Sequence, residues 1–148
     1  MKIYLASDHA GFELKGVVKK YLEEKGYQVE DSGAFSFDKN DDYPDFIQKA
    51  ALQTSKENGI GIVFGKSGAG ECIVANKIKG IRAILGFSKD NVKLSREHND
   101  ANVLSLGSQF VDENLAKELV DIFLSTPFSK EERHIRRVER IKKIEESL

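Results

Sequence analysis

The sequence has 148 residues, 40% of them hydrophobic, a size and composition that suit one compact domain with a proper core. With 23 basic and 24 acidic side chains the net charge is -1, so no overall field attracts nucleic acid or an anionic membrane. Cys72 is the single cysteine, the first residues carry no secretory leader pattern, and no apolar run approaches the roughly 20 residues of a membrane span. We therefore expect one cytoplasmic domain, 1–148, that binds neither a membrane nor nucleic acid.

Apolar runs typical of strands alternate with segments of helical periodicity. Strands are predicted over residues 2–7, 27–31, 60–64, 82–87 and 102–106, and helices over residues 11–25, 43–58, 68–79, 89–97 and 112–124. Residues 32–42, rich in Ser, Gly, Asp and Asn, indicate an ordered surface loop. This βα series predicts a parallel, doubly wound sheet.

The tail, residues 129–148, carries Ile135, Val138, Ile141, Ile144 and Leu148 along one side of a predicted helix. Such an apolar stripe suits packing either on the core of the same chain or on a second subunit.

In an open parallel sheet, ligands bind beyond the carboxyl ends of the strands, and we expect three polar clusters at such ends. The first is Asp8 and His9, where Gly11 lets the chain turn into a helix. The alternative is an N-terminal helix cap beside an exposed histidine.

The second cluster is the loop formed by residues 65–71, whose small residues let backbone N–H groups point at an anion or oxyanion. A phosphate-binding P-loop would need glycine at position 60, where Ile60 stands, and the dinucleotide fingerprint would need Gly or Ala at position 73, where Ile73 stands. ATP, GTP and NAD are therefore not expected as ligands.

Glu71 follows that loop in the first turn of a predicted helix, where a carboxylate often only stabilises the helix. The functional alternative is a base beside an oxyanion-binding loop, the pairing that removes a proton next to a carbonyl. The helix N-terminus would lower the pKa of Glu71, whereas desolvation would raise it, and the sequence leaves this balance open.

The third cluster, His98 and Asn99, offers an imidazole for proton transfer and an amide to hold an oxygen, or a simple C-terminal helix cap. Arg133 and Arg137 stand one helical turn apart, which suits a grip on a phosphate. The alternative is a solvated helix surface whose arginines pair with neighbouring glutamates.

Taken in order, the motifs SDHAG, GKSGAGECIVANK, REHNDANVLSLGS and RHIRR, with the DYPD turn at Asp42–Asp45, resemble the ribose-5-phosphate isomerase B and galactose-6-phosphate isomerase family over nearly the whole chain. The resemblance implies a Rossmann-like α/β/α sandwich with a five-stranded parallel sheet, and aldose-ketose isomerisation of a sugar phosphate through a cis-enediolate. It implies a homodimer with shared active sites, or a tetramer built from such dimers, whose C-terminal helix packs on the partner subunit. No metal or cofactor is expected.

The resemblance also implies residue roles. His98 would open the furanose ring and Asn99 would hold the enediolate oxygen. The backbone amides of the Gly-rich loop would cradle the enediolate, and Arg133 and Arg137 would take the phosphate. Ser67 of that loop is expected to be catalytic, together with Glu71, His98 and Asn99. The remaining residues expected to bind the substrate are Asp8, His9, Tyr43, Lys66, Gly68, Ala69 and Gly70.

The family has two forms, one with a cysteine base just before the Gly-rich loop and one with a glutamate base just after it. Here Gly65 stands at the cysteine position and Glu71 at the glutamate position, so the sequence resembles the glutamate form. Lys66, where a small residue is expected, and Gln109, where some relatives have arginine, depart from the pattern.

Ribose 5-phosphate is the expected substrate. The alternatives are a six-carbon substrate, allose 6-phosphate or galactose 6-phosphate, and a non-catalytic protein that only binds a sugar phosphate.

Overall fold

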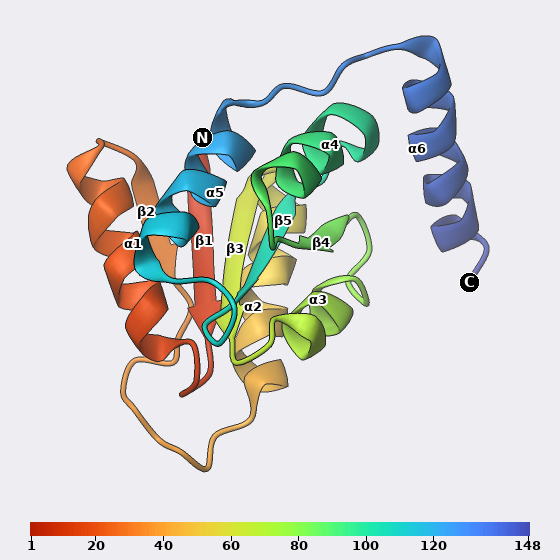
Figure 1. The fold of residues 1–148 in the computed structure, drawn as a ribbon. Coiled ribbons are helices and arrows are strands. Elements are labelled where there is room, and N and C mark those ends of the chain that lie inside the picture. The colour runs from red at the N-terminus through yellow and green to blue at the C-terminus, as the bar shows by residue number, and fades with distance from the viewer.

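The computed structural model describes residues 1–148 as one parallel five-stranded sheet covered by helices (Figure 1). The sheet order is β2-β1-β3-β5-β4, which confirms the α/β fold. The strands are β1 (Lys2–Ser7), β2 (Gln28–Asp31), β3 (Ile60–Gly65), β4 (Ala83–Leu85) and β5 (Val103–Gly107). The helices are α1 (Phe12–Glu24), α2 (Tyr43–Glu57), α3 (Ala69–Ala75), α4 (Lys89–Asn99), α5 (Glu113–Ser125) and α6 (Glu132–Glu146).

Two apolar clusters make this a three-layer α/β/α sandwich. Successive side chains of a strand point to opposite faces, so Ile3 and Leu5 of β1 join one cluster while Tyr4 and Ala6 join the other. The first cluster includes residues of α1, α4 and α5, and the second includes residues of α2 and α3. Because both faces are covered, the central strands are buried along nearly their whole length, as a parallel sheet requires.

One predicted helix and one predicted strand were too long. The helix expected over residues 68–79 ends at Ala75, because the Asn76 side chain turns to bond the backbone N and O of Ala83, at 2.8 and 2.9 Å. The strand expected over residues 82–87 covers only Ala83–Leu85. It is an edge strand, paired with β5 alone.

The last helix, α6, stands apart from the sandwich at the end of an extended connection (Figure 1). It packs against α4, and His134 and Val138 are its buried residues. Ile135, Ile141 and Ile144 are 42%, 45% and 62% exposed, so most of the predicted apolar stripe is not covered by this chain. None of the helices combines the length and the apolar character that a membrane-spanning segment needs.

The strand register sets the position of the functional loops. Ser7 at the end of β1 lies beside Phe64 of β3, and Gly65 at the end of β3 lies beside Gly107 of β5. The carboxyl ends of three neighbouring strands therefore meet at one edge, and the loop of residues 32–42 runs past the same edge (Figure 1).

Candidate active site

The turn after β1 brings Asp8 and His9 to the carboxyl edge. Asp8 is 7% exposed, and its Oδ1 accepts a hydrogen bond from the backbone N–H of Gly11 at 3.1 Å. A side chain at position 11 would lie within 2.6 Å of the Cβ atom of Phe64, so only glycine lets this turn pack against the end of β3. Asp8 therefore stabilises the turn, as a helix-capping role would suggest, and also faces the edge where ligands bind.

The Gly-rich loop follows β3 at the same edge. Gly68 has φ +81°, a conformation that favours glycine, and its carbonyl accepts a hydrogen bond from the buried Ser105 hydroxyl at 2.7 Å. Ser67 lies against Gly107, and its Oγ accepts a hydrogen bond from the backbone N–H of Ala69 at 3.2 Å. The loop is thus fixed in place by the ends of two strands.

Other predicted residues complete this side of the edge. The ring of Tyr43 lies over Gly70, since a Cβ added at position 70 would come within 2.7 Å of the tyrosine hydroxyl. Lys66 is exposed, as are Ser67 and Ala69. The structure therefore gathers Asp8, His9, Tyr43, Lys66, Ser67, Gly68, Ala69, Gly70 and Glu71 at one edge of the sheet.

Glu71 is the buried acid of this group. It is 4% exposed, and its Oε2 has no hydrogen-bond partner. Burial raises the pKa of Glu71, and the negative charge of Asp8 raises it further, whereas the backbone N–H groups of Glu71 and Gly68 lower it. The balance that the sequence left open is decided by burial, which outweighs the helix N-terminus.

The space around Glu71 depends on Gly65. A Cβ atom at position 65 would overlap the Glu71 carboxylate, so the acid occupies the volume that a side chain there would need. Burial also raises the pKa of the Cys72 thiol, which keeps it protonated and unsuited to act as a base.

His98 and Asn99 lie at the end of a helix before the fifth strand, as predicted, but not at a carboxyl edge of the sheet. They form the last turn of α4, immediately before β5, and therefore lie at the amino edge of the sheet. The expectation that all three clusters follow carboxyl ends is wrong for this one, because helices return antiparallel to the strands and α4 ends where β5 begins. Asn99 is exposed and His98 is half-buried.

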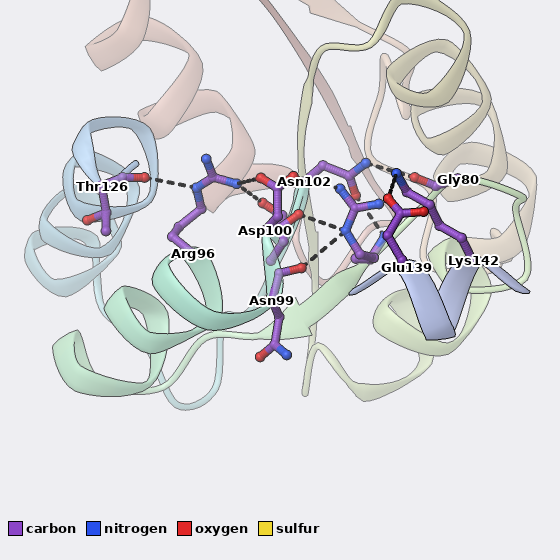
Figure 2. A network of polar contacts seen from close by, with 10 residues as sticks. Gly80, Arg96, Asn99, Asp100, Asn102, Thr126, Glu139 and Lys142 are labelled. Carbon is purple, nitrogen blue, oxygen red and sulfur yellow. Dashed lines mark hydrogen bonds and ion pairs between the residues drawn. The ribbon is translucent and has the colours of Figure 1, made fainter. Parts of the chain in front are cut away.

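Two arginines fix the end of α4. Arg96 Nη1 bonds Asp100 Oδ1 at 3.1 Å, and Arg82 Nε donates to the carbonyl oxygens of Asn99 and Asp100 at 3.1 and 2.8 Å. Figure 2 shows these contacts converging on Asp100, while the Asn99 side chain points away from them. The amide of Asn99 is thus held on a rigid turn and remains available to a ligand.

The start of α6 joins this second group. His134 is 4% exposed, its ring stacks on that of His98 with the centroids 4.3 Å apart, and its Nδ1 lies 2.6 Å from the hydroxyl oxygen of Ser129. Burial lowers the pKa of His134, and the neighbouring His98 lowers it further. Arg133 and Arg137 are exposed on the same helix, and Arg133 pairs with Glu131 at 3.0 Å.

One chain therefore carries two groups of predicted site residues on opposite edges of the sheet. The carboxyl-edge group contains Glu71, and the amino-edge group contains His98, Asn99, Arg133 and Arg137. The five residues of β5 separate the edges by roughly 15 Å, too far for one small ligand to contact both groups in the same chain.

Sequence reasoning missed two contacting residues. Asp41 Oδ1 lies 2.7 Å from His9 Nδ1, and His134 stacks on His98. Asp41 precedes the DYPD turn, which was the available signal, whereas no local pattern links positions 98 and 134. Ligand atoms of Asp8, His9 and Asp41 lie within 4.8 Å of one another, but His9 Nδ1 pairs with Asp41 Oδ1 and Asp8 Oδ1 accepts the Gly11 N–H, so we assign no metal site to them.

Comparison with known proteins identifies the family of this chain. A sequence model of the family described as Ribose/Galactose Isomerase matches residues 3–141. Ribose-5-phosphate isomerase B of Mycolicibacterium paratuberculosis is 46% identical over 140 residues, which cover 94% of this chain and 88% of that protein.

Solved structures agree with the sequence match. Ribose-5-phosphate isomerase B of Mycoplasma genitalium with bound ribulose-5-phosphate is 40% identical, with a TM-score of 0.95 over 99% of this chain and 97% of the other. The Thermotoga maritima ribose 5-phosphate isomerase is 44% identical, with a TM-score of 0.91 over 96% of this chain and 97% of the other. From the fold, the motifs and these matches together it follows that the chain is an isomerase and belongs to the ribose/galactose isomerase family.

Proposed function

We propose that the chain interconverts ribose 5-phosphate and ribulose 5-phosphate through a cis-enediolate, with Glu71 as the base. The observation that carries this proposal is the buried carboxylate of Glu71, whose Oε2 is unpartnered and which sits beside a glycine-rich loop. A raised pKa makes an acid a better proton acceptor once it is ionised, and burial excludes the water that would compete for it. Mere binding would need neither property.

The proposed proton transfers balance as follows. His98 delivers a proton to the ring oxygen and takes up the proton of the C1 hydroxyl, so the furanose opens to the aldehyde and His98 ends in its starting state. Glu71 then takes the proton from C2, and the charge moves to O1 of the enediolate. Glu71 returns this proton to C1, and the hydroxyl proton of O2 passes to O1, which yields the ketose.

The enediolate oxygens need hydrogen-bond donors, which the carboxyl-edge group and the amino-edge group would each supply. The backbone amides of residues 67–70 supply them at the carboxyl edge, with Ser67 beside them, and Asn99 supplies an amide from the other group. Asp8 and Tyr43 line the sugar. These roles agree with the placement of the Gly-rich loop between the ends of β3 and β5.

Because the two groups lie on opposite edges of one sheet, we propose that two copies build each site. Glu71 and its loop come from one subunit, and His98, Asn99, Arg133 and Arg137 come from the other. The uncovered face of α6, with Ile141 and Ile144, supports a homodimer in which this helix packs on the partner. A tetramer built from two such dimers would contain the same shared sites.

The phosphate would be held mainly by Arg137 and Arg133, with His9 and Lys66 adding positive charge from the other subunit. Lys66 and Gln109 are neighbours, since the backbone N–H of Gln109 donates to the Lys66 carbonyl at 3.0 Å. Lys66 can therefore supply at this place the charge that Gln109 lacks.

Ribose 5-phosphate is preferred over allose 6-phosphate and galactose 6-phosphate because the similar proteins named above are ribose 5-phosphate isomerases. The test is turnover by the purified enzyme on all three aldose phosphates, followed as ketose formation. Selective turnover of ribose 5-phosphate supports the proposal, and selective turnover of a six-carbon substrate would reassign it. Binding of all three without turnover would favour a non-catalytic sugar-phosphate-binding protein.

The enediolate route needs no metal or other cofactor. We expect turnover to be unchanged after treatment with a chelator. Loss of activity with EDTA and its recovery with a divalent ion would contradict this expectation. The cytoplasm is the proposed location.

A further inference from the structure

The contact between Asp41 and His9 has no part in the proton transfers described above. Asp41 Oδ1 lies 2.7 Å from His9 Nδ1 and also accepts the backbone N–H of His9 at 3.1 Å. One carboxylate oxygen therefore holds both the backbone and the ring of the same histidine. Such a two-point contact fixes the rotation of the ring about its side-chain bonds.

The loop that carries Asp41 is itself anchored at its beginning. Lys15, which is 2% exposed, donates from Nζ to Asp31 Oδ1 at 2.8 Å and to the Ala34 carbonyl at 2.5 Å. The backbone N–H of Ala34 donates to the Ser7 carbonyl at 2.7 Å. The loop is thus tied to β1, the strand that leads into His9.

A second residue of the loop touches the ring from another side. Phe37 meets His9 edge to face, with the ring centroids 6.0 Å apart. His9 and Phe37 also border an open hollow of about 560 Å³, whose other lining residues are Ala10, Phe12 and Glu13. With Nδ1 turned to Asp41, the other ring nitrogen, Nε2, makes no hydrogen bond within the chain, and 31% of the side chain is exposed.

Folding stability does not explain the position of Asp41. Its side chain is 8% exposed, and Oδ2 is buried without a hydrogen-bond partner. An unpartnered buried carboxylate oxygen is costly, so Asp41 lowers folding stability in this position while its Oδ1 holds His9.

We propose that Asp41 is a positioning residue that holds His9 with Nε2–H directed at the phosphate of the substrate, so that His9 binds this anion as an imidazolium. This inference rests on the proposed function for the identity of the anion. The protonation state of the His9 ring does not depend on that function. The charged groups acting on His9 are the carboxylates of Asp8, on its own turn, and of Asp38 and Asp41, from the loop. Glu13 of α1 borders the same hollow.

The electrostatics agree with this assignment. The hydrogen bond to Asp41 is the largest cause that raises the pKa of His9, and the charge of Asp8 adds to it, whereas desolvation acts in the opposite direction. The stabilised form of His9 is the cation, which is fully present at low pH and is lost as the pH rises through the raised pKa. Phosphate affinity should weaken over the same range.

The experiment compares Asp41→Asn with wild type. The amide preserves size and one acceptor oxygen but removes the charge, and Asp38→Asn is the matched control, since Asp38 is an acid of the same loop that makes no hydrogen bond to His9. The readouts are the NMR titration of the His9 ring, assigned with His9→Gln, and the pH dependence of KM and kcat for ribose 5-phosphate.

For Asp41→Asn we expect His9 to titrate about one pH unit lower and KM near pH 7.5 to rise by up to about tenfold, since one unit changes the protonated fraction by at most that factor. The change in kcat should be small, and Asp38→Asn should leave both readouts close to wild type.

An unchanged His9 titration in Asp41→Asn, an unchanged KM, or equal effects from the two variants would overturn the proposal. If the wild-type enzyme does not turn over ribose 5-phosphate, the proposed function fails separately. Titration with inorganic phosphate, followed on the His9 ring, then decides the role of Asp41: weaker phosphate binding in Asp41→Asn supports it, and equal binding overturns it.

Discussion

The carboxylate of Glu71 fills the space that a side chain at position 65 would occupy. The two positions lie on either side of the Gly-rich loop, at the end of β3 and in the first turn of α3. A base can therefore be placed at this point from either side of the loop, but not from both sides at once. In this chain position 65 is glycine, and the carboxylate of Glu71 occupies the space that a side chain there would need.

Removing the charge of Glu71 should abolish most of the turnover. We expect Glu71→Gln to lower kcat by about 10²- to 10⁴-fold, the usual contribution of a general base, with only a small change in KM. The measurement is steady-state kinetics on ribose 5-phosphate. Near-normal turnover by Glu71→Gln would refute Glu71 as the base.

The same residue should set the acid limb of the pH profile. Because burial raises the pKa of Glu71, its carboxylate is lost on acidification at a higher pH than an ordinary glutamate, whose pKa is 4.5. The value of kcat/KM should therefore begin to fall above pH 4.5. A limb centred at or below that value would contradict the burial argument.

The raised pKa of Glu71 also predicts an effect on stability. Ionisation of this buried acid is unfavourable in the folded state, so its contribution to folding weakens as the pH rises from 4.5 through the raised pKa. Glu71→Gln should accordingly be at least as stable as wild type at neutral pH. Thermal unfolding of both proteins at pH 5 and pH 8 provides the comparison.

A side chain at position 65 should be tolerated only when Glu71 is shortened. We expect Gly65→Ala to reduce turnover sharply and to lower the free energy of unfolding by about 1–3 kcal/mol, since overpacking displaces the acid. In a Glu71→Ala background the same change should cost less than about 1 kcal/mol. Additive effects on unfolding would show that the two positions do not compete for one space.

Gly16→Ala is the control for the comparison of Gly65→Ala in the wild-type and Glu71→Ala backgrounds. Position 16 lies in the interior of α1, and a Cβ there meets nothing within 4 Å. The substitution should stabilise the protein by about 0.5–1 kcal/mol, because alanine favours the helix.

Arg137 should act on binding rather than on chemistry. Arg137→Ala is expected to raise KM about tenfold or more, as the loss of a charge-assisted bond to phosphate would do, with a smaller effect on kcat. Arg136→Ala, an exposed neighbour about 100° away around α6, is the matched control and should be close to wild type. Equal KM values for the two variants would place Arg137 on the solvated surface.

Acidification should lower the local stability of α6. The pKa of the buried His134 is lowered, so the neutral ring contributes stability above pH 6.5 that is lost as the pH falls below it. Hydrogen exchange of Glu132–Glu146, corrected for intrinsic rates, should accelerate between pH 7.5 and pH 5.5 more than that of Phe12–Glu24. An equal change in both helices would argue against His134.

The alternation of strands and helices could be predicted from the sequence because its apolar periodicity reflects burial on the two faces of the sheet. Ile3 and Leu5 on one face, and Tyr4 and Ala6 on the other, show this directly. The element ends were less predictable. The end of α3, for example, depends on a contact between Asn76 and Ala83 that local patterns do not encode.

The positions of the candidate site residues in the fold were predictable where these residues are consecutive, and not where they depend on tertiary contacts. The Gly-rich loop and Glu71 were placed correctly, because a strand end, a flexible loop and a helix start follow one another in the chain. The edge on which His98 lies was missed. The contact between His9 and Asp41 spans 32 positions, and the direction of the Glu71 pKa shift depends on burial, so both required the tertiary structure.

The most direct test of the central claim, that two copies of the chain build each isomerase site, is subunit complementation between Glu71→Gln and Asn99→Ala. Each variant alone should be nearly inactive. In a mixed dimer one site carries both substitutions and the other carries neither, so co-refolding equal amounts should restore about a quarter of wild-type turnover. Activity that stays at the level of the separate variants would contradict a site shared between subunits.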